Sequence, residues 1–191
     1  MPRNTLSLIL LCLVLVLQGC AAAVVAGAAT GAAVAYDRRT AGSIVDDEAV
    51  EVKASAGINA DNQLKDQAHI NVTSMNGIVL LSGEAVSAEA RDRVLSQVRT
   101  IPSIRRIHNE IRIAPLSSFG ARSTDSWYTS KVKSRLLFTR DLDSNRIKVV
   151  TENGTVYLMG LVNHAEADAA TEIASTTQGV QRVVRMFEYL D

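Results

Sequence analysis

The chain contains the dipeptide Asn-Gly at two places 77 residues apart, Asn76-Gly77 and Asn153-Gly154, each between two strand-like runs. Asparagine and glycine readily adopt the positive φ angles of a two-residue type I′ turn, so each dipeptide predicts a β-hairpin. Apolar and glycine residues match on both arms at the same offset: Ile70 and Val72 with Ile147 and Val149, and Val79, Leu81, Gly83 and Ala85 with Val156, Leu158, Gly160 and Val162. Matches in register along two arms predict two copies of one folding unit.

Helical spacing of apolar residues precedes and follows each hairpin. The matching sets are Ala54 and Ile58 with Val132 and Leu136, Val94 and Val98 with Ala170 and Ala174, and Ile104, Ile107 and Ile111 with Val180, Val183 and Phe187. Each copy therefore predicts helix, strand, strand, helix, strand: an α+β fold with a three-stranded mixed sheet packed on two helices. We expect the copies to span residues 46–114 and 124–191 and, because units of about 65 residues are marginally stable alone, to contact each other. Gly83 and Gly160 are expected to end strands at tight turns.

The N-terminus resembles a bacterial export signal. Arg3 precedes an apolar run from Leu8 to Leu17, which is too short to span a bilayer and is followed by Gln18-Gly19-Cys20. The sequence LQGC resembles the lipobox of bacterial lipoproteins, in which the cysteine receives the lipid. The alternative is an ordinary secretory signal with a cysteine near the cleavage site.

Cleavage at the lipobox would divide the N-terminal segment in two. Residues 1–19 are predicted to be the signal peptide, and residues 20–45 a lipidated cysteine with a flexible linker rich in small residues. Cys12 leaves with the signal, so Cys20 has no partner for an internal disulfide and serves as the attachment point for acyl chains such as palmitate. By analogy with lipoprotein sorting, Ala21 after the cysteine favours the periplasmic face of the outer membrane.

The two copies carry a motif, V-x-L-x-G-x-[AV], at residues 79–85 and 156–162. Together with the order of elements and the stretches EVKASAGI, INVTS and VTENGTVYLMGLV, this motif resembles the BON domain. A lipobox followed by two BON domains over nearly the whole mature chain is similar to a family of outer-membrane lipoproteins associated with cell division. The resemblance implies binding to anionic phospholipid and a part in envelope integrity, possibly at division sites, and it does not imply catalysis.

The stretch SWYTSKVKSRLLF, residues 126–138, is predicted to be the first helix of the second copy, with Thr124, Asp125 and Ser126 available to cap its N-terminus. On a helical wheel, Tyr128, Val132 and Leu136 form the stripe that covers the sheet. A second apolar stripe with basic residues on both borders is expected to face outward: Trp127, Leu137 and Phe138, passing Ser130 and Ser134, with Lys131 and Arg135 on one side and Lys133 on the other.

An apolar stripe with tryptophan and basic borders is typical of a helix that lies in a lipid headgroup layer. The corresponding helix of the first copy, residues 46–58, has four acidic residues, one lysine and no aromatic residue, so the scaffold alone does not require such a surface. We therefore expect a phospholipid-binding site with seven residues: Trp127, Lys131, Lys133, Ser134, Arg135, Leu137 and Phe138. The ligand would be phosphatidylglycerol or cardiolipin. The alternative for this face is packing of Trp127 against the first copy.

Other classes of function have less support in the sequence. The mature chain has 19 basic and 20 acidic residues after loss of Arg3, so attraction to an anionic partner must come from a local patch. His69, His108 and His164 lie on different expected elements, and no metal or nucleophile constellation is apparent. The sequence predicts a non-enzymatic protein without metal, cofactor or nucleic acid. The rival hypothesis is a periplasmic adaptor for an envelope assembly or a cell-wall regulator.

Overall fold

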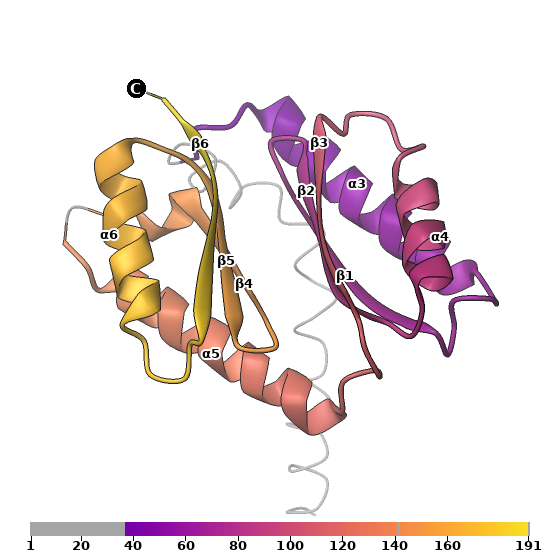
Figure 1. The fold of residues 1–191 in the computed structure, drawn as a ribbon. Coiled ribbons are helices and arrows are strands. Elements are labelled where there is room, and N and C mark those ends of the chain that lie inside the picture. Colours follow the sequence, from indigo (N-terminus) through magenta and orange to yellow (C-terminus); the bar gives the residue numbers. More distant parts are fainter. Residues whose placement is uncertain (1–36, 141, 191) are drawn as a thin grey trace, which may run out of the picture. The chain divides into compact units, whose positions relative to one another are not determined.

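The computed structural model describes residues 37–140 and 142–190, and the predicted signal peptide, Cys20 and most of the linker lie outside them. Two successive stretches of chain adopt the same order of elements (Figure 1). The first domain contains α3 (Ala41–Ala60), β1 (Ala68–Met75), β2 (Ile78–Ala85), α4 (Ala88–Val98) and β3 (Arg106–Ile113). The second contains α5 (Phe119–Leu137), the 3₁₀ helix η3 (Ser144–Arg146), β4 (Ile147–Glu152), β5 (Thr155–Val162), α6 (His164–Ser175) and β6 (Arg182–Tyr189). The predicted α+β architecture is confirmed.

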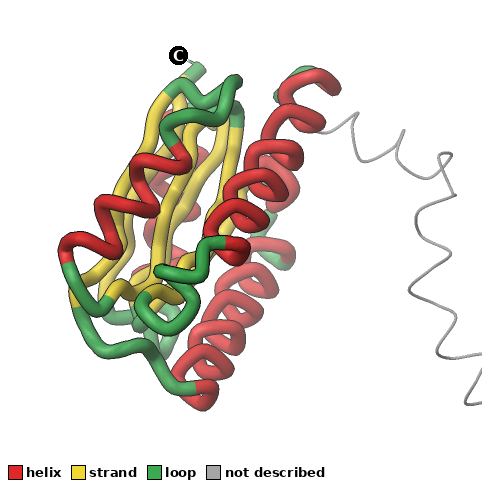
Figure 2. The backbone as a smooth tube through the Cα atoms, turned by 90° about the vertical axis from the view of Figure 1, so that its right-hand side faces the viewer, coloured by secondary structure: helices red, strands yellow, loops and turns green. Residues whose placement is uncertain are grey.

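Each domain has one mixed three-stranded sheet, in the order β1-β2-β3 or β4-β5-β6. The middle strand pairs antiparallel with the strand before it and parallel with the strand after it. Parallel neighbours require a crossover, which α4 and α6 supply. Figure 2 shows these helices and strands along the backbone.

The Asn-Gly dipeptides form the hairpin tips, as predicted. In the first hairpin, Met75 pairs with Ile78, so only Asn76 and Gly77 remain for the turn. Their φ angles are 52° and 72°, and those of the second dipeptide are 48° and 70°. Positive φ at both central positions is the mark of a type I′ turn, which matches the right-handed twist of the strands.

The expectation that Gly83 and Gly160 end strands at tight turns is wrong. Gly83 lies within β2 and Gly160 within β5, each paired to the neighbouring strand. A Cβ atom at Gly83 would collide with the carbonyl oxygen of His69, and one at Gly160 with that of Arg146. These glycines are needed because neighbouring backbone, β1 at His69 and the end of η3 at Arg146, passes too close for a side chain.

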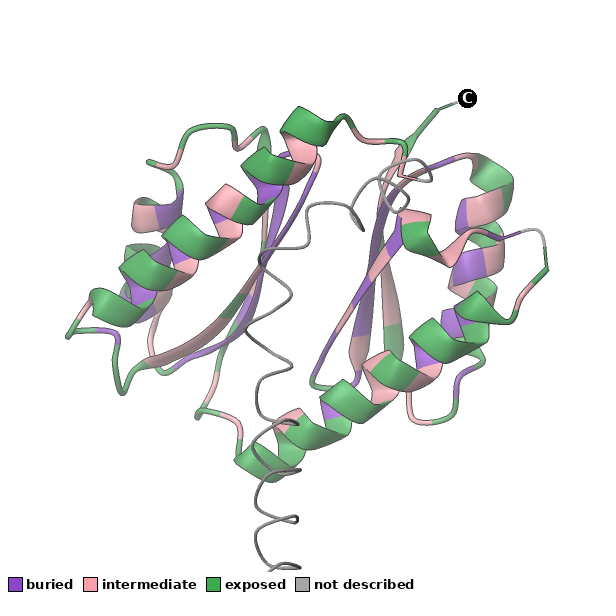
Figure 3. Ribbon diagram, turned by 180° about the vertical axis from the view of Figure 1, so that it is seen from behind, coloured by how far each residue is buried: buried purple, intermediate pink, exposed green. Residues whose placement is uncertain are grey.

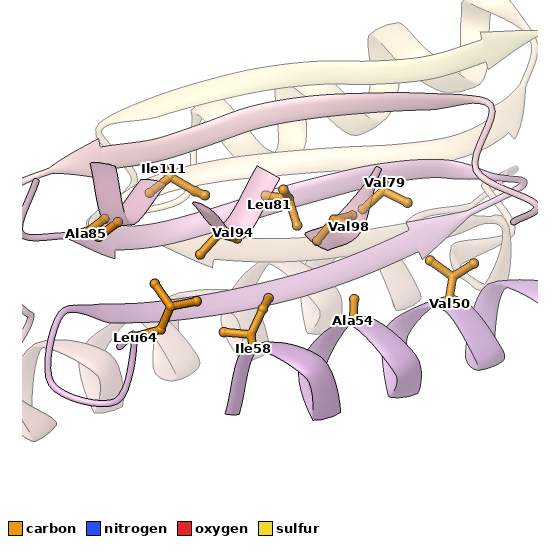
Figure 4. Packing of buried hydrophobic residues seen from close by; sticks show 11 residues of the cluster. Val50, Ala54, Ile58, Leu64, Val79, Leu81, Ala85, Val94, Val98 and Ile111 are labelled. Atoms are coloured by element: carbon orange, nitrogen blue, oxygen red, sulfur yellow. The ribbon is translucent and has the colours of Figure 1, made fainter. Parts of the chain in front are cut away.

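One face of each sheet packs on two helices. In the first domain Val50, Ala54 and Ile58 follow one another along α3 and face the strands, where Val79 and Leu81 are fully buried (Figure 4). The second domain repeats this core with Val132 and Leu136 on α5, Val149 on β4, and Val156 and Leu158 on β5. The spacing on both helices is therefore set by burial against the sheet.

The other faces of the two sheets contact each other through a third apolar cluster. Its buried members come from both domains: Met75, Ile78, Leu80, Tyr157, Met159 and Met186. Ion pairs beside this cluster also join the two domains: Lys148 Nζ of β4 lies 2.6 Å from Glu51 Oε1 of α3, and Arg105 Nη2 lies 2.7 Å from Glu188 Oε1 of β6. Residues 37–191 thus form one compact unit, and the expected contact between the copies is made by sheets.

The first helix of each domain begins earlier than expected. Helix α3 starts at Ala41, inside the predicted linker, because Thr40 caps it by accepting a hydrogen bond from the backbone of Ser43. Helix α5 starts at Phe119 behind the cap residue Ser118. Within the described ranges, no helix has both the length and the apolar character needed to cross a bilayer.

Candidate functional site

Asp125, expected to cap α5, instead lies inside the helix and fixes it to the sheet. Its two carboxylate oxygens accept hydrogen bonds from the backbone N–H groups of Asn153, at 2.8 Å, and Gly154, at 2.9 Å. Asp47 on α3 does the same for Asn76 and Gly77. In both domains this carboxylate binds the first helix to the hairpin turn and so fixes the orientation of the helix about its own axis.

This rotation turns the predicted apolar stripe of α5 outward. Trp127 is 63% exposed, Leu137 63% and Phe138 82%, whereas Val132 and Leu136 are buried. Figure 3 shows the outward side of α5 as exposed and its inward positions as buried. The alternative placement of Trp127 between the domains does not agree with this exposure, since the apolar interdomain cluster consists of sheet residues.

The longer helix adds a residue that sequence reasoning missed. Phe119, at the first position of α5, is 78% exposed and lies on the same side of the helical wheel as Trp127 and Leu137. With a rise of about 1.5 Å per residue, the stripe from Phe119 to Leu137 is about 27 Å long. An extension of the helical wheel to residues before Ser126 would have found it.

Polar residues between these aromatics have their hydroxyl groups turned back to the helix. The Oγ atoms of Ser123, Ser126 and Ser130 donate to carbonyl oxygens four residues earlier in the chain, at 2.9–3.1 Å. A hydroxyl that is already hydrogen-bonded costs less to remove from water. The whole stripe is therefore better suited to a poorly hydrated surface than its serine content suggests.

Helix α3 provides an internal comparison at equivalent positions, 78 residues earlier. Where α5 has Phe119, Trp127, Leu137 and Phe138, α3 has Ala41, Ala49, Asn59 and Ala60. Both helices keep the apolar residues that face the sheet, and both keep the buried aspartate. Helix α3 exposes Val45 and Val52 at other positions, but the exposed aromatic side chains belong to α5 and are not a requirement of the fold.

The three predicted basic residues have different surroundings. Arg135 is directed at the C-terminal end of α6, where it donates to the carbonyl oxygen of Ile173 and the hydroxyls of Thr176 and Thr177. Lys131 Nζ donates to the carbonyl oxygen of Gln178 at 2.7 Å and lies 5.8 Å from the ring centroid of Tyr128. Lys131 and Arg135 thus both have structural contacts.

Lys133 and Ser134 are the uncommitted polar members of the predicted site. Neither side chain has a hydrogen bond or ion pair within the described ranges. Both line a hollow of about 460 Å³ at the C-terminal end of α5, together with Leu137 of the stripe and Arg39 of the segment that precedes α3. The ammonium and the hydroxyl are available to an anion there.

Ionisable residues cluster where β1 meets α5 and β4. Glu152 is almost fully buried; burial raises its pKa, and nearby Glu84 and Asp125 add to this effect, while a hydrogen bond from Asn71 opposes it. His69 lies in the same region, and burial, helped by the charge of Arg122, lowers its pKa. In the part of the chain that the structure describes, no three histidine, cysteine or acidic side chains are arranged to hold a metal ion.

Comparison with known proteins gives the domain type. The family model of the BON domain matches residues 46–115 and again residues 124–191. The chain is 39% identical over 183 residues to a Haemophilus influenzae protein named outer membrane lipoprotein DolP, and the match covers 96% of this chain and 95% of that protein.

Two further relatives match most of their own length. The 21 kDa hemolysin of Actinobacillus pleuropneumoniae is 39% identical over 154 residues, which cover 81% of this chain and 79% of that protein. The osmotically-inducible protein Y of Escherichia coli K12 is 27% identical over 145 residues, which cover 74% and 72%. The identity to DolP extends beyond the two matched domains.

Proposed function

This chain belongs to the BON-domain family and contains two BON domains, and we propose that it is an outer-membrane lipoprotein that binds anionic phospholipid through α5. It acts by binding and not by catalysis. The name of its Haemophilus relative, which matches along almost the entire chain, supports the location. The lipid anchor would be the acyl chains on Cys20, and the ligand phosphatidylglycerol or cardiolipin.

The exposed stripe of α5 is the observation that carries this proposal. Large apolar side chains at four positions of one helix, where the sister helix has alanine or asparagine, need a contact that the rest of the described chain does not provide. A membrane interface accepts a helix of this kind lengthwise, with the aromatic side chains at headgroup level and the lysines near phosphate.

The contacts of the basic residues refine their predicted roles. A basic side chain near an anionic leaflet contributes about 1 kcal/mol, so the three predicted cations would contribute about 3 kcal/mol together. Lys131 and Arg135 donate to neutral oxygens at and just after the end of α6, so they keep the charge that attracts an anionic surface, while Lys133 keeps its donors free for phosphate as well. Ser134 adds an uncommitted hydroxyl beside Lys133.

Attraction of this size is weak alone and sufficient for a tethered protein. The 17 residues from Cys20 to Asp37 span at most about 60 Å when fully extended, so acylation keeps the folded unit close to the bilayer. A weak second contact forms readily at the resulting local concentration. In this scheme acyl chains hold the protein at the membrane, and α5 selects regions rich in anionic lipid. The protein supports envelope integrity there, including at division sites.

The fluorescence of Trp127, the chain's single tryptophan, tests the proposal directly. Non-acylated protein comprising residues 21–191 is titrated with neutral phosphatidylcholine vesicles and with vesicles that contain phosphatidylglycerol. We expect a blue shift with the anionic vesicles only, and added salt should weaken it because screening reduces lysine attraction.

Charge reversals of one lysine on each first helix identify the surface responsible. Lys133→Glu should weaken vesicle binding, whereas Lys53→Glu on α3 should leave it unchanged. An emission spectrum indifferent to anionic vesicles would refute the proposal and favour the periplasmic adaptor. Equal binding to neutral vesicles would refute the role of charge.

A further inference from the structure

Helix α5 inserts an arginine into the groove beside α6. Arg135 Nη1 lies 2.8 Å from the carbonyl oxygen of Ile173 and 2.7 Å from Oγ1 of Thr177, and Nη2 lies 3.1 Å from Oγ1 of Thr176. A cation at this place is favoured because the last carbonyl groups of a helix lack partners within the helix and carry partial negative charge. The second domain therefore satisfies the end of α6 with its own side chain.

The first domain lacks this arginine. Gly57 of α3 stands where α5 has Arg135, and the positions of Ile173, Thr176 and Thr177 are taken by Gln97, Thr100 and Ile101 at the end of α4. A hollow of about 460 Å³ lies between α3 and α4, lined by these four residues and by Lys53, Ala54 and Ser96. All the positions that Arg135 bridges in the second domain thus line a cavity in the first.

The hollow contains a buried acceptor without a donor. Gln97 Nε2 donates to a carboxylate oxygen of Asp61, which directs the amide oxygen Oε1 away from that contact. Oε1 is buried and has no hydrogen-bond partner among the described residues. A Cβ atom added at Gly57 would lie 3.8 Å from it, so this oxygen faces the place where an α3 side chain is missing. Unpaired buried acceptors are rare and destabilising.

We infer that the hollow between α3 and α4 is a binding site for an arginine side chain presented by a partner protein. The guanidinium would occupy the position that Arg135 holds in the second domain and donate to Gln97 Oε1 and to the carbonyl groups at the end of α4. Thr100 Oγ1, the counterpart of the Thr176 hydroxyl, lies at the same site. The site is distinct from the α5 stripe and would bind protein while α5 contacts lipid.

Arginine suits this site better than lysine. A guanidinium is planar and has several donors in fixed directions, so it can serve an amide oxygen and helix carbonyls together, which a single ammonium does less well. Lys53 at the rim does not exclude a second cation, because its counterpart Lys131 lies one helical turn from Arg135 in the second domain.

Side-chain amide NMR of Gln97 in the protein of residues 21–191 tests the inference. The probe is the capped tripeptide Gly-Arg-Gly, compared with Gly-Lys-Gly and with Gly-citrulline-Gly, which keeps the shape and loses the charge. We expect saturable shifts of the Gln97 amide and of Thr100 with the arginine peptide, and binding at least about tenfold weaker with the other two.

Variants of residues that line the hollow distinguish arginine binding in the hollow from non-specific binding of the peptide elsewhere. Gly57→Arg supplies the missing side chain internally and should abolish peptide binding, while Gly57→Ala should preserve it. Gln97→Met removes the acceptor and should weaken binding about tenfold, and this variant decides the question if Gly57→Arg does not fold. Absence of saturation at tens of millimolar peptide, equal binding of the three peptides, or full binding by Gln97→Met would each overturn the inference. None of these outcomes depends on vesicle binding.

Discussion

Replacement of Asp47 by asparagine tests the hydrogen bonds between the buried aspartate and the hairpin turn, which fix the orientation of the first helix about its own axis. Asp47 Oδ1 accepts hydrogen bonds from Ser74 Oγ at 2.6 Å and from the Gly77 backbone at 2.8 Å. Its Oδ2 accepts from the Asn76 backbone at 2.6 Å and from Arg39 Nη1 at 2.8 Å. Asparagine keeps one oxygen, so two donors lose their acceptor and one buried N–H then faces an amide NH₂.

The expected loss of stability follows from these contacts. A buried donor left without an acceptor costs about 1–3 kcal/mol, and Arg39 keeps its second partner Asp37, so we expect Asp47→Asn to cost about 2–4 kcal/mol. The matched variant Asp125→Asn should cost about 1–3 kcal/mol, since Asp125 accepts from two turn N–H groups and has no ion pair among the described residues. The difference isolates the contribution of the Arg39 contact to Asp47.

The penalty for Asp47→Asn should depend on pH. Burial opposes ionisation of Asp47, but its hydrogen bonds outweigh burial and hold its pKa below the ordinary value. The stability gained from the charged form is therefore present at neutral pH and is lost as pH falls through this lowered pKa. The difference in unfolding free energy between wild type and Asp47→Asn should shrink in acid.

Urea unfolding of residues 21–191 provides the measurement, with far-UV circular dichroism for both domains and Trp127 fluorescence for the second. Asp47→Asn should shift the circular dichroism transition, and Asp125→Asn should shift the fluorescence transition as well. Penalties below about 0.5 kcal/mol for both variants would contradict the assigned role of the aspartates, as would a larger penalty for Asp125→Asn than for Asp47→Asn.

Three further changes test other parts of the structure. Phe119→Ser should weaken binding to anionic vesicles about fivefold in a flotation assay, because one partly inserted aromatic contributes about 1 kcal/mol. Unchanged binding would mean that only the C-terminal part of α5 contacts the membrane. Met159→Ala opens a cavity between the sheets and should cost about 2–5 kcal/mol in urea unfolding. Glu152→Gln should raise the melting temperature at neutral pH, because burial raises the pKa of this carboxyl and disfavours its charged form. The gain should disappear in acid, where the wild-type carboxyl is also neutral. A gain in melting temperature that does not change with pH would refute this explanation.

The fold was largely predictable because its signals are local. Asn-Gly predicts a two-residue turn, and the alternation of apolar and polar residues predicts which side of each strand is buried. Both patterns occur in each of the two copies, so each copy supports the prediction made from the other. The contact between the sheets also has a signal in the sequence: Leu80 and Met159 interrupt the expected alternation with apolar residues, which indicates a strand buried on both faces.

The helix starts and the role of Arg135 were not predictable in the same way. Asp125 is a good capping residue by type, but its partners are turn N–H groups 28 and 29 residues further along the chain. Arg135 lies on the border of the stripe by helical spacing, yet its guanidinium reaches α6, about 40 residues later. Such choices depend on which distant backbone groups tertiary packing leaves unsatisfied.

Comparison of the two domains separates what the scaffold needs from what each copy has acquired. Both first helices retain the turn-binding aspartate and the apolar residues over the sheet, so these positions serve folding. At the remaining positions the copies diverge in opposite directions. Helix α5 has exposed aromatic residues and an arginine that fills its own groove, whereas α3 has no aromatic residue and has a glycine that leaves its groove open. A closed groove suits the proposed lipid contact of α5, because the end of α6 is then satisfied without a partner. An open groove with a buried unpaired acceptor is an unfavourable surface until something fills it, which supports the proposed division of roles: protein binding in the first domain and lipid binding in the second.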